Sequence, residues 1–331
     1  MRSLCSIILS AIVTLILFSP SAQAIEIIYP ADKTVVLRSN YLIIKGGDKP
    51  PLEELIVEVN GEASDPLDIS SAEYKAAFAD FLILEPEWDA GKNTIVVKGQ
   101  VGGKVVATAK AEIFYNSHAD PVAIIPKGFQ PYVLHTPEKE ALCVPCHNMN
   151  PTAAELRGAT AANNPCASCH ARMFDKQFVH GPEGVFQCVD CHDSKSKPQR
   201  WQVTKDDLTL CGECHIDKID EFKKNPFVHG PVATGDCVTC HDPHASSHPA
   251  QLNAPINTLC LGCHDVIGKK THVVRGVSGK GHPLDKVTDP TNPGRSLSCA
   301  SCHNPHGEAT EYFFTGGVKS RFALCGRCHQ K

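Results

Sequence analysis

The sequence predicts two unlike parts, an all-β sandwich followed by a region of loops and short helices with little sheet. Short β-branched runs separated by glycine and asparagine turns fill the first third of the 331-residue chain. Of the 17 cysteines, Cys5 stands near the N-terminus and the other 16 all follow residue 142. Prolines at 121, 126, 131 and 137 separate the two patterns. The two parts therefore need separate explanations.

Residues 1–24 have the features of a secretion signal. Arg2 is followed by an apolar run from Ile7 to Phe18 and by the small-x-small sequence Ala22-Gln23-Ala24. The run is too short to span a bilayer, which takes about 20 residues. An uncleaved anchor is the weaker alternative. We expect a periplasmic protein, or one exported to the outer surface, with no integral membrane segment in the mature chain.

Residues 25–116 are expected to form an immunoglobulin-like β-sandwich. The runs IEIIY, TVVL, YLIIK, ELIVEV, FLILE, NTIVV and KVVATAKAEIFY give about seven strands in about 90 residues, the number typical of that fold. Only SSAEYKAAFADF also suits a short helix. Through VEVNG and DAGKNTIVVKGQ this part resembles the bacterial immunoglobulin-like modules of exported proteins. It contains no cluster of His, Asp or Glu, so a spacer or docking role is expected.

The segment 117–134 is predicted to be a proline-rich linker, because prolines at this density oppose helix and interior strand alike. The net charge of the whole chain is −4, so no strongly basic surface is expected and nucleic acid is excluded as a partner.

The remainder, residues 135–331, contains the pentapeptide Cys-x-x-Cys-His eight times, which uses all 16 remaining cysteines. The cysteine pairs are Cys143 and Cys146, Cys166 and Cys169, Cys188 and Cys191, Cys211 and Cys214, Cys237 and Cys240, Cys260 and Cys263, Cys299 and Cys302, and Cys325 and Cys328. The histidines that complete them are His147, His170, His192, His215, His241, His264, His303 and His329.

This pentapeptide is the attachment signature of haem c. Two thiols three positions apart can each form a thioether with one vinyl group of a porphyrin, and the adjacent histidine then reaches the iron from one face. A disulfide framework, four zinc sites or thioredoxin-like redox pairs are other uses of sixteen cysteines. None of them requires histidine after every second cysteine. We therefore expect eight covalently attached haem c groups.

The motifs are arranged in pairs. Their first cysteines are 23 residues apart in the first three pairs and 26 apart in the fourth, so the repeating unit is a two-haem module that occurs four times. Over residues 135–331 the chain resembles the multihaem cytochromes c of the doubled-CxxCH family. The resemblance includes the pairing, the histidines upstream of the motifs, and the sequences Cys-His-Asp-Pro-His and Cys-His-Asn-Pro-His.

Nine further histidines are candidates for the sixth ligands of eight irons. His135, His180 and His229 each precede a module by eight residues, and His282 precedes the fourth module by 17. His244 and His306 follow a motif histidine by three residues, too close to reach the same iron, so each is expected to ligate a neighbouring haem. His272, His248 and His118 are weaker candidates. If two of these three fail, one haem is open or bound by Met149 or Met173.

About 190 residues with eight haems cannot bury them in a conventional core, so the porphyrins must form the core. The sequence favours an electron carrier with closely packed, mostly bis-histidine haems whose potentials, as the resemblance implies, are low and spread over a range. Its expected partners are other redox proteins, such as cytochromes, quinol-oxidising complexes or outer-membrane conduits. The alternative is a multihaem oxidoreductase with one open haem that acts on nitrite, hydroxylamine or a sulfur oxyanion.

Overall fold

The computed structural model describes most of the chain beyond the leader. The described residues are 25–36, 41–47, 49–116, 126–197, 199–269, 272–273, 282, 284 and 286–329. The expected leader lies outside them, as does His118. Within the described part, no helix is long and apolar enough to cross a membrane.

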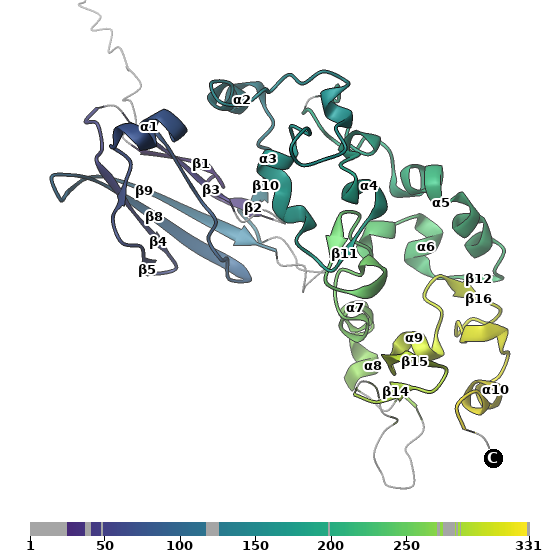
Figure 1. The fold of residues 1–331 in the computed structure, drawn as a ribbon. Helices are drawn as coiled ribbons and strands as arrows, with labels where there is room; N and C mark the ends of the chain where they lie inside the picture. The colour runs from purple at the N-terminus through teal and green to yellow at the C-terminus, as the bar shows by residue number, and fades with distance from the viewer. Residues whose placement is uncertain are drawn as a thin grey trace, which may run out of the picture.

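The N-terminal region is built from two β-sheets (Figure 1). The three-stranded sheet has the order β1-β3-β7, and its strands pair antiparallel. The larger sheet has the order β10-β2-β9-β8-β4-β5, with β6 also paired to β4. The strands are β1 Ile25–Tyr29, β2 Thr34–Val36, β3 Leu42–Gly46, β4 Glu54–Val59, β5 Glu62–Ala63, β6 Leu67–Asp68, β7 Phe81–Leu84, β8 Gly91–Val101, β9 Lys104–Tyr115 and β10 Gln130–Pro131.

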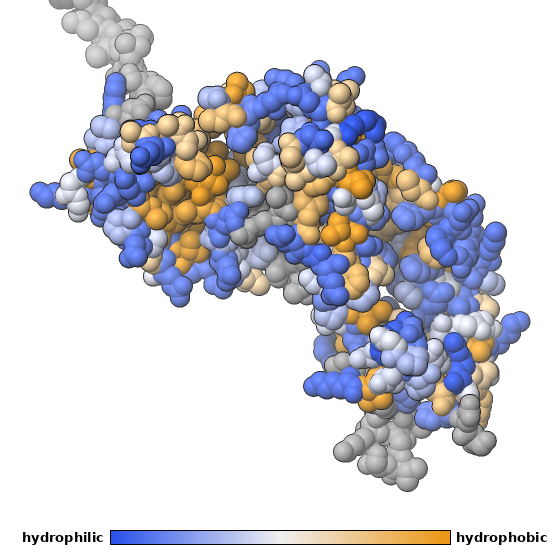
Figure 2. Space-filling view, viewed as in Figure 1, coloured by the Kyte–Doolittle hydropathy of each residue, from blue (hydrophilic) through white to orange (hydrophobic). Residues whose placement is uncertain are grey.

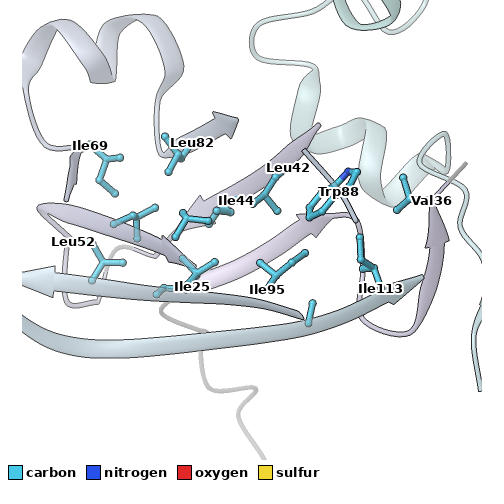
Figure 3. Packing of buried hydrophobic residues seen from close by; sticks show 14 residues of the cluster. Ile25, Val36, Leu42, Ile44, Leu52, Ile69, Leu82, Trp88, Ile95 and Ile113 are labelled. Carbon is cyan, nitrogen blue, oxygen red and sulfur yellow. The ribbon is translucent and has the colours of Figure 1, made fainter. Parts of the chain in front are cut away.

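A single apolar core fills the space between these sheets (Figure 3). Alternate residues of β3 and β8 point inward, so that Leu42, Ile44, Ile95 and Val97 are fully buried. Trp88 closes the core at one end, as the close-up shows. The period-two alternation in the sequence therefore places the buried residues as a half-buried strand requires.

All seven predicted runs form strands, and the β-rich region agrees with the expected fold class. The ambiguous stretch contains a helix, α1 Ala72–Phe78, because the Ser71 hydroxyl accepts from the Tyr74 N–H and so caps its first turn. The immunoglobulin-like identity of the sandwich is not decided by these elements.

The predicted linker contributes a strand that the sequence did not indicate. β10 pairs in parallel with β2 at the edge of the larger sheet. Pro131 is tolerated there because an edge strand leaves one side of its backbone unpaired. Next to it, the Tyr132 hydroxyl donates to the Ile28 carbonyl at 2.6 Å, and burial raises the pKa of Tyr132 to about 12. The chain leading into the C-terminal region is thus fastened to the sandwich.

The C-terminal region consists of short helices, 3₁₀ turns and two-residue strands, as expected, and runs away from the sandwich in an extended arc (Figure 1). Its helices are α2 Pro137–Cys143, α3 Ala167–His170, α4 Gly181–Gly184, α5 Asp207–Lys223, α6 Gly230–Thr234, α7 Ile256–Cys263, α8 Asp265–Lys269, α9 Cys299–Cys302 and α10 Arg321–Gly326. The 3₁₀ turns are η1 Glu155–Arg157, η2 Ala171–Phe174, η3 Cys188–Asp190, η4 Cys237–Thr239, η5 Pro249–Gln251 and η6 Thr315–Gly317.

Three antiparallel strand pairs join segments that are distant in the sequence or close a local loop. β11 Phe178–Val179 pairs with β13 Ala245–Ser246, β12 Phe227–Val228 pairs with β16 Gly307–Glu308, and β14 Thr288–Asp289 pairs with β15 Asn292–Ser296. The first two pairs connect the second module to the third and the third to the fourth. The modules are therefore held in sequence order.

The C-terminal region buries few apolar side chains of its own. Of its described residues, only Leu156, Ala167, Ile219, Ala245, Ala254, Leu297 and Phe314 are buried and apolar, and three of these are alanines. Its surface in Figure 2 is largely hydrophilic with scattered apolar patches. Valines inside the motifs, such as Val144 and Val238, are exposed. Such a region lacks the buried area that a stable domain needs, unless cofactors supply it.

Replacing Ile95 with alanine is expected to destabilise the sandwich by about 2–5 kcal/mol, because a fully buried side chain is removed from a closed core. Urea unfolding of the full-length holo-protein, followed by far-UV circular dichroism, measures the loss, while Soret absorbance follows the other region.

The matched control is Val105→Ala on β9, where the side chain is 50% exposed. It should change the free energy of unfolding by about 0.5 kcal/mol or less. Equal losses for the two variants would contradict the packing described for the core.

Candidate haem-binding sites

Each Cys-x-x-Cys-His motif forms a single helical turn, which places both thiols and the imidazole at one short segment. In seven motifs the N–H of the histidine donates to the carbonyl of the first cysteine at 2.9–3.1 Å. The fourth motif lies inside α5, which bends at His215. We number the sites 1 to 8 in chain order of these motifs.

At seven sites a second histidine faces the histidine of the motif. The ring centroids are 5.9–6.2 Å apart. The facing partners are His135 with His170, His244 with His192, His180 with His215, His306 with His241, His229 with His264, His272 with His303, and His282 with His329.

This separation fits an iron held between two imidazoles. Metal–nitrogen bonds of about 2 Å on each side, with about 1 Å from each nitrogen to its ring centre, place the two centroids roughly 6 Å apart. The geometry therefore suits six-coordinate haem at sites 2 to 8.

Six of the seven facing histidines follow two rules, and His272 at site 7 follows neither. At sites 2, 4, 6 and 8 the partner is the histidine upstream of the same module. At sites 3 and 5 it comes from the next module, because His244 reaches His192 and His306 reaches His241, in both cases with ring planes within 10° of parallel. The sequence predicted that these two histidines serve a neighbouring haem, and the structure identifies which one.

Cysteine thiols connect consecutive modules. Cys166 of site 2 hydrogen-bonds to Cys188 of site 3, an interaction that lowers the pKa of Cys166 to about 7 and raises that of Cys188. The corresponding contacts at the next two junctions join Cys211 to Cys237 and Cys260 to Cys299. Sites with consecutive numbers are therefore neighbours in space at each junction.

Burial keeps several facing histidines neutral, which is the form that binds a metal. Burial, together with the neighbouring His135, His192 and His244, lowers the pKa of His170 to about 4. The pKa values of His180, His192, His229 and His306 are also lowered, with burial as the largest cause.

In five of the described ligand candidates a ring nitrogen bonds to a backbone carbonyl. The Nδ1 atoms of His192, His241 and His303 lie 2.6–2.8 Å from the carbonyl oxygens of Trp201, Ala250 and Tyr312. His180 and His229 bond in the same way to the carbonyls of Pro243 and Pro305. With Nε2 free for a metal, Nδ1–H is the donor in each case.

At site 2 the facing histidine hydrogen-bonds to a buried carboxylate that is itself paired with an arginine. His135 Nδ1 lies 3.1 Å from Glu140 Oε1, and Arg200 Nη1 lies 2.8 Å from Glu140 Oε2. Glu140 is 8% exposed, and Arg200 also stacks its guanidinium over Trp201. A carboxylate in this position makes the imidazole a stronger ligand than a carbonyl does. No pattern in the sequence indicated Glu140 or Arg200.

Two described candidates, His248 and Met149, are not brought opposite a motif histidine. His248 lies beside a cavity of 320 Å³ lined also by Lys176, Asp242 and Asn253. His118 lies outside the described residues. Met149 uses its carbonyl to accept from Arg200 at 3.0 Å. Site 1, with His147, is consequently the site for which no facing histidine is described.

The other uses of the cysteines find little support in this geometry. All sixteen cysteines of the motifs are unpaired. Among the described residues, no group of three or more His, Cys, Asp or Glu side chains is arranged to hold a metal ion, as a zinc site requires. Two facing histidines with a tethered macrocycle between them need no such group.

Comparison with known proteins identifies the motifs. Three segments, 180–220, 229–269 and 292–331, match the doubled CXXCH motif, and they indicate a multihaem c-type cytochrome with covalently attached haem c. The matched segments cover the second, third and fourth modules, and the first module lies outside them. No match was found among the curated proteins.

Among solved structures, the chain is similar to an endo-β-1,4-mannanase from Thermotoga petrophila, with 12% identity over 30% of this chain and a TM-score of 0.24. It spans only 21% of that enzyme. Fibronectin(III)-like modules of Clostridium thermocellum CbhA match with 18% identity over 26% of this chain and 92% of theirs, with a TM-score of 0.19. Similarities this low carry no argument about fold or function.

Replacing Glu140 with glutamine is expected to raise the reduction potential of the haem at site 2, because a neutral amide accepts a weaker hydrogen bond from His135. Arg200→Gln should lower the same potential, since it leaves the carboxylate without its counter-charge. EPR-monitored redox titration of the oxidised holo-protein measures both shifts.

The two substitutions should shift the reduction potential in opposite directions. A simple loss of structure would shift the potential of both variants in the same direction. Glu138→Gln on α2 is the matched control, because that carboxylate is exposed two residues away. A potential that is unchanged in E140Q would contradict the tuning role of Glu140.

Proposed function

We propose that the chain is an exported octahaem cytochrome c that transfers electrons along closely packed, mostly bis-histidine haems between redox partners. The single observation that carries this proposal is the set of seven facing histidine pairs with centroid separations of 5.9–6.2 Å. An iron with two strong axial ligands changes its charge by one electron without gaining or losing a ligand. It offers no position to a substrate.

The order of the sites supports transfer along the chain. At the three module junctions a motif cysteine of one module lies beside a motif cysteine of the next, which places sites 2 and 3, 4 and 5, and 6 and 7 next to each other. The His-x-Pro-His sequences add a second connection, since His241 and His244 bring sites 5 and 3 within three residues of each other. These contacts connect sites 2 to 7, so electrons can pass between neighbouring haems along that part of the array.

The protein's own groups bind and orient the cofactors. The haems supply one-electron redox chemistry when bound. The cysteines fix each macrocycle, the motif histidine and its partner hold the metal, and the carbonyl or carboxylate at Nδ1 sets the strength of the imidazole ligand.

The partners are other redox proteins, such as cytochromes, quinol-oxidising complexes or outer-membrane conduits. Haem propionates would add negative charge to the net −4 of the chain, so a positively charged patch on the partner would favour docking. The proposed location is the periplasm or the outer surface. The sandwich would position the haem array, because β10 and Tyr132 fasten the start of that array to it.

The competing function is reduction of nitrite, hydroxylamine or a sulfur oxyanion at one open haem. Site 1 is the place where it would occur, because it is the site without a described facing histidine. The two functions are separated by the spin state of the irons.

In the oxidised holo-protein, low-temperature EPR is expected to give low-spin ferric signals alone, with a mass that corresponds to eight haems. His244→Ala should remove the facing ligand of site 3 and convert about one haem in eight to a high-spin or water-bound form. Electron transfer between the two ends of the array should be slower in this variant. Stopped-flow reduction of the holo-protein measures its rate.

His244→Met serves as the companion variant, since a thioether keeps the site six-coordinate and raises its potential. His248→Ala is the control that leaves all sites unchanged. A wild-type protein with one high-spin haem that reduces nitrite or hydroxylamine catalytically would replace the carrier proposal with the enzyme.

Deleting residues 25–116 tests the role of the sandwich. The haem array should keep its absorption spectrum, while binding to its redox partner, measured by surface plasmon resonance against membrane extracts fractionated for haem proteins, should weaken. Unchanged binding would argue against a docking role.

A further inference from the structure

The modules repeat one another, so the facing residue of site 1 corresponds in position to those of sites 3 and 5. At sites 3 and 5 the facing histidine comes from a loop in the following module, three residues after that module's first motif histidine. The corresponding loop of the second module follows His192. Its third residue is Lys195.

The three loops have the same backbone hydrogen bonds. In each, the N–H of the residue after the motif histidine donates to a carbonyl nine residues later: Asp193 to Gln202 at 3.0 Å, Asp242 to Gln251 at 2.7 Å, and Asn304 to Phe313 at 2.8 Å. The imidazoles of His192, His241 and His303 bond at Nδ1 to equivalent carbonyls. The loops are therefore structural copies of one another.

The turn that presents the third residue is also the same. The backbone N–H of His244 donates to Asp242 Oδ1 at 2.9 Å, and that of His306 donates to Asn304 Oδ1 at 3.1 Å. The N–H of Lys195 donates to Asp193 Oδ1 at 2.8 Å. An Asx turn of this kind fixes the direction in which the third residue leaves the backbone. Lys195 thus occupies the position from which His244 and His306 reach the preceding module.

The loop of the second module lies against the first module. Arg200 donates to the Met149 carbonyl at 3.0 Å and to Glu140, and the Trp201 ring meets His135 edge-on with centroids 6.3 Å apart. Met149 is two residues from His147. These contacts connect the first module to the second. At the two later junctions the corresponding connections are the β11–β13 and β12–β16 strand pairs.

The chemistry of Lys195 suits a sixth ligand. Its side chain is exposed, and its amine makes no hydrogen bond or ion pair with any residue that the structure describes. A neutral amine has one lone pair for a metal, and coordination to a cationic iron displaces the proton of the ammonium group to solvent. The long side chain also tolerates some displacement of the two modules.

We propose that Lys195 is the sixth ligand of the haem at site 1, so that this haem has imidazole–amine coordination while the other seven have two imidazoles. The proposal rests on the octahaem cytochrome function for the presence of haem at Cys143 and Cys146. It gives the haem nearest the sandwich in the sequence a ligand set different from that of every other haem in the array.

The test combines EPR with near-infrared magnetic circular dichroism on the oxidised, full-length holo-protein. The energy of the near-infrared charge-transfer band distinguishes imidazole–amine from bis-imidazole coordination. One haem in eight should show the amine band in the wild type. Lys195→Ala should convert that haem to high spin, and Lys195→His should restore a low-spin haem with the bis-imidazole band.

Lys197→Ala is the matched control, because this exposed lysine lies two residues further along the same loop. It should leave both spectra unchanged, as should His118→Ala and His248→Ala. The proposal is overturned if Lys195→Ala leaves the spectra unchanged, or if His118→Ala or His248→Ala produces the high-spin haem instead. It is also overturned if the wild type already contains one high-spin haem.

The number of bound haems distinguishes failure of the Lys195 ligand from failure of the octahaem assignment. A mass that corresponds to eight haems in Lys195→Ala, with unaltered spectra, overturns the ligand assignment and leaves the electron-transfer function intact. A mass that corresponds to seven haems in the wild type, with site 1 unloaded, overturns the octahaem assignment and the ligand with it.

Discussion

The facing of two imidazole rings about 6 Å apart is the interaction on which the C-terminal region depends. Each pair joins segments that lie far apart in the sequence, as His241 and His306 do. The polypeptide in this region has too little buried apolar surface to hold such segments together by itself. Coordination to a tethered cofactor supplies that missing free energy, so cofactor binding and folding become one event.

The sandwich differs from the C-terminal region because it can be stabilised by its own buried apolar surface. Its sheets enclose a continuous core of branched aliphatic side chains and Trp88, and it needs no cofactor. Its connection to the haem region is made by backbone pairing at β10 and by the hydrogen bond from Tyr132. The sandwich, which needs no cofactor, is thus joined to the cofactor-dependent haem region close to His135, the first facing histidine in the chain.

Variation among otherwise similar sites is the means by which such an array can direct electrons. Five of the ligand imidazoles bond to backbone carbonyls, which are uncharged and are not removed by a side-chain substitution. Site 2 uses the Glu140 carboxylate instead, and at the junction with site 1 the loop carries Lys195 where the later loops carry histidine. Both departures concern the two sites of the first module, which lies outside the segments that match the doubled CXXCH motif, although Lys195 itself belongs to the second module.

Much of this could be predicted from local sequence. Eight pentapeptides identify the attachment residues, because thioether formation and proximal ligation need only a fixed spacing of three side chains. Short β-branched runs between turn signals likewise predicted seven strands of the sandwich, while the short strands β5, β6 and β10 were not predicted. Spacing also selected His135, His180, His229, His244, His282 and His306 as candidates for the sixth position.

What the sequence left open is which histidine faces which. Spacing along the chain does not determine how modules stack, and only the tertiary structure pairs His244 with His192 and leaves His248 beside a cavity. Glu140 and Arg200 were missed for the same reason, since they are 60 residues apart and meet only when the second module packs on the first. Lys195 occupies the position that is histidine in the later two loops. Its proposed role as a ligand follows only because the three loops have the same turn in the structure. The sequence by itself determined the local chemistry, and the tertiary structure decided its partners, because ligand pairing is a long-range contact between modules.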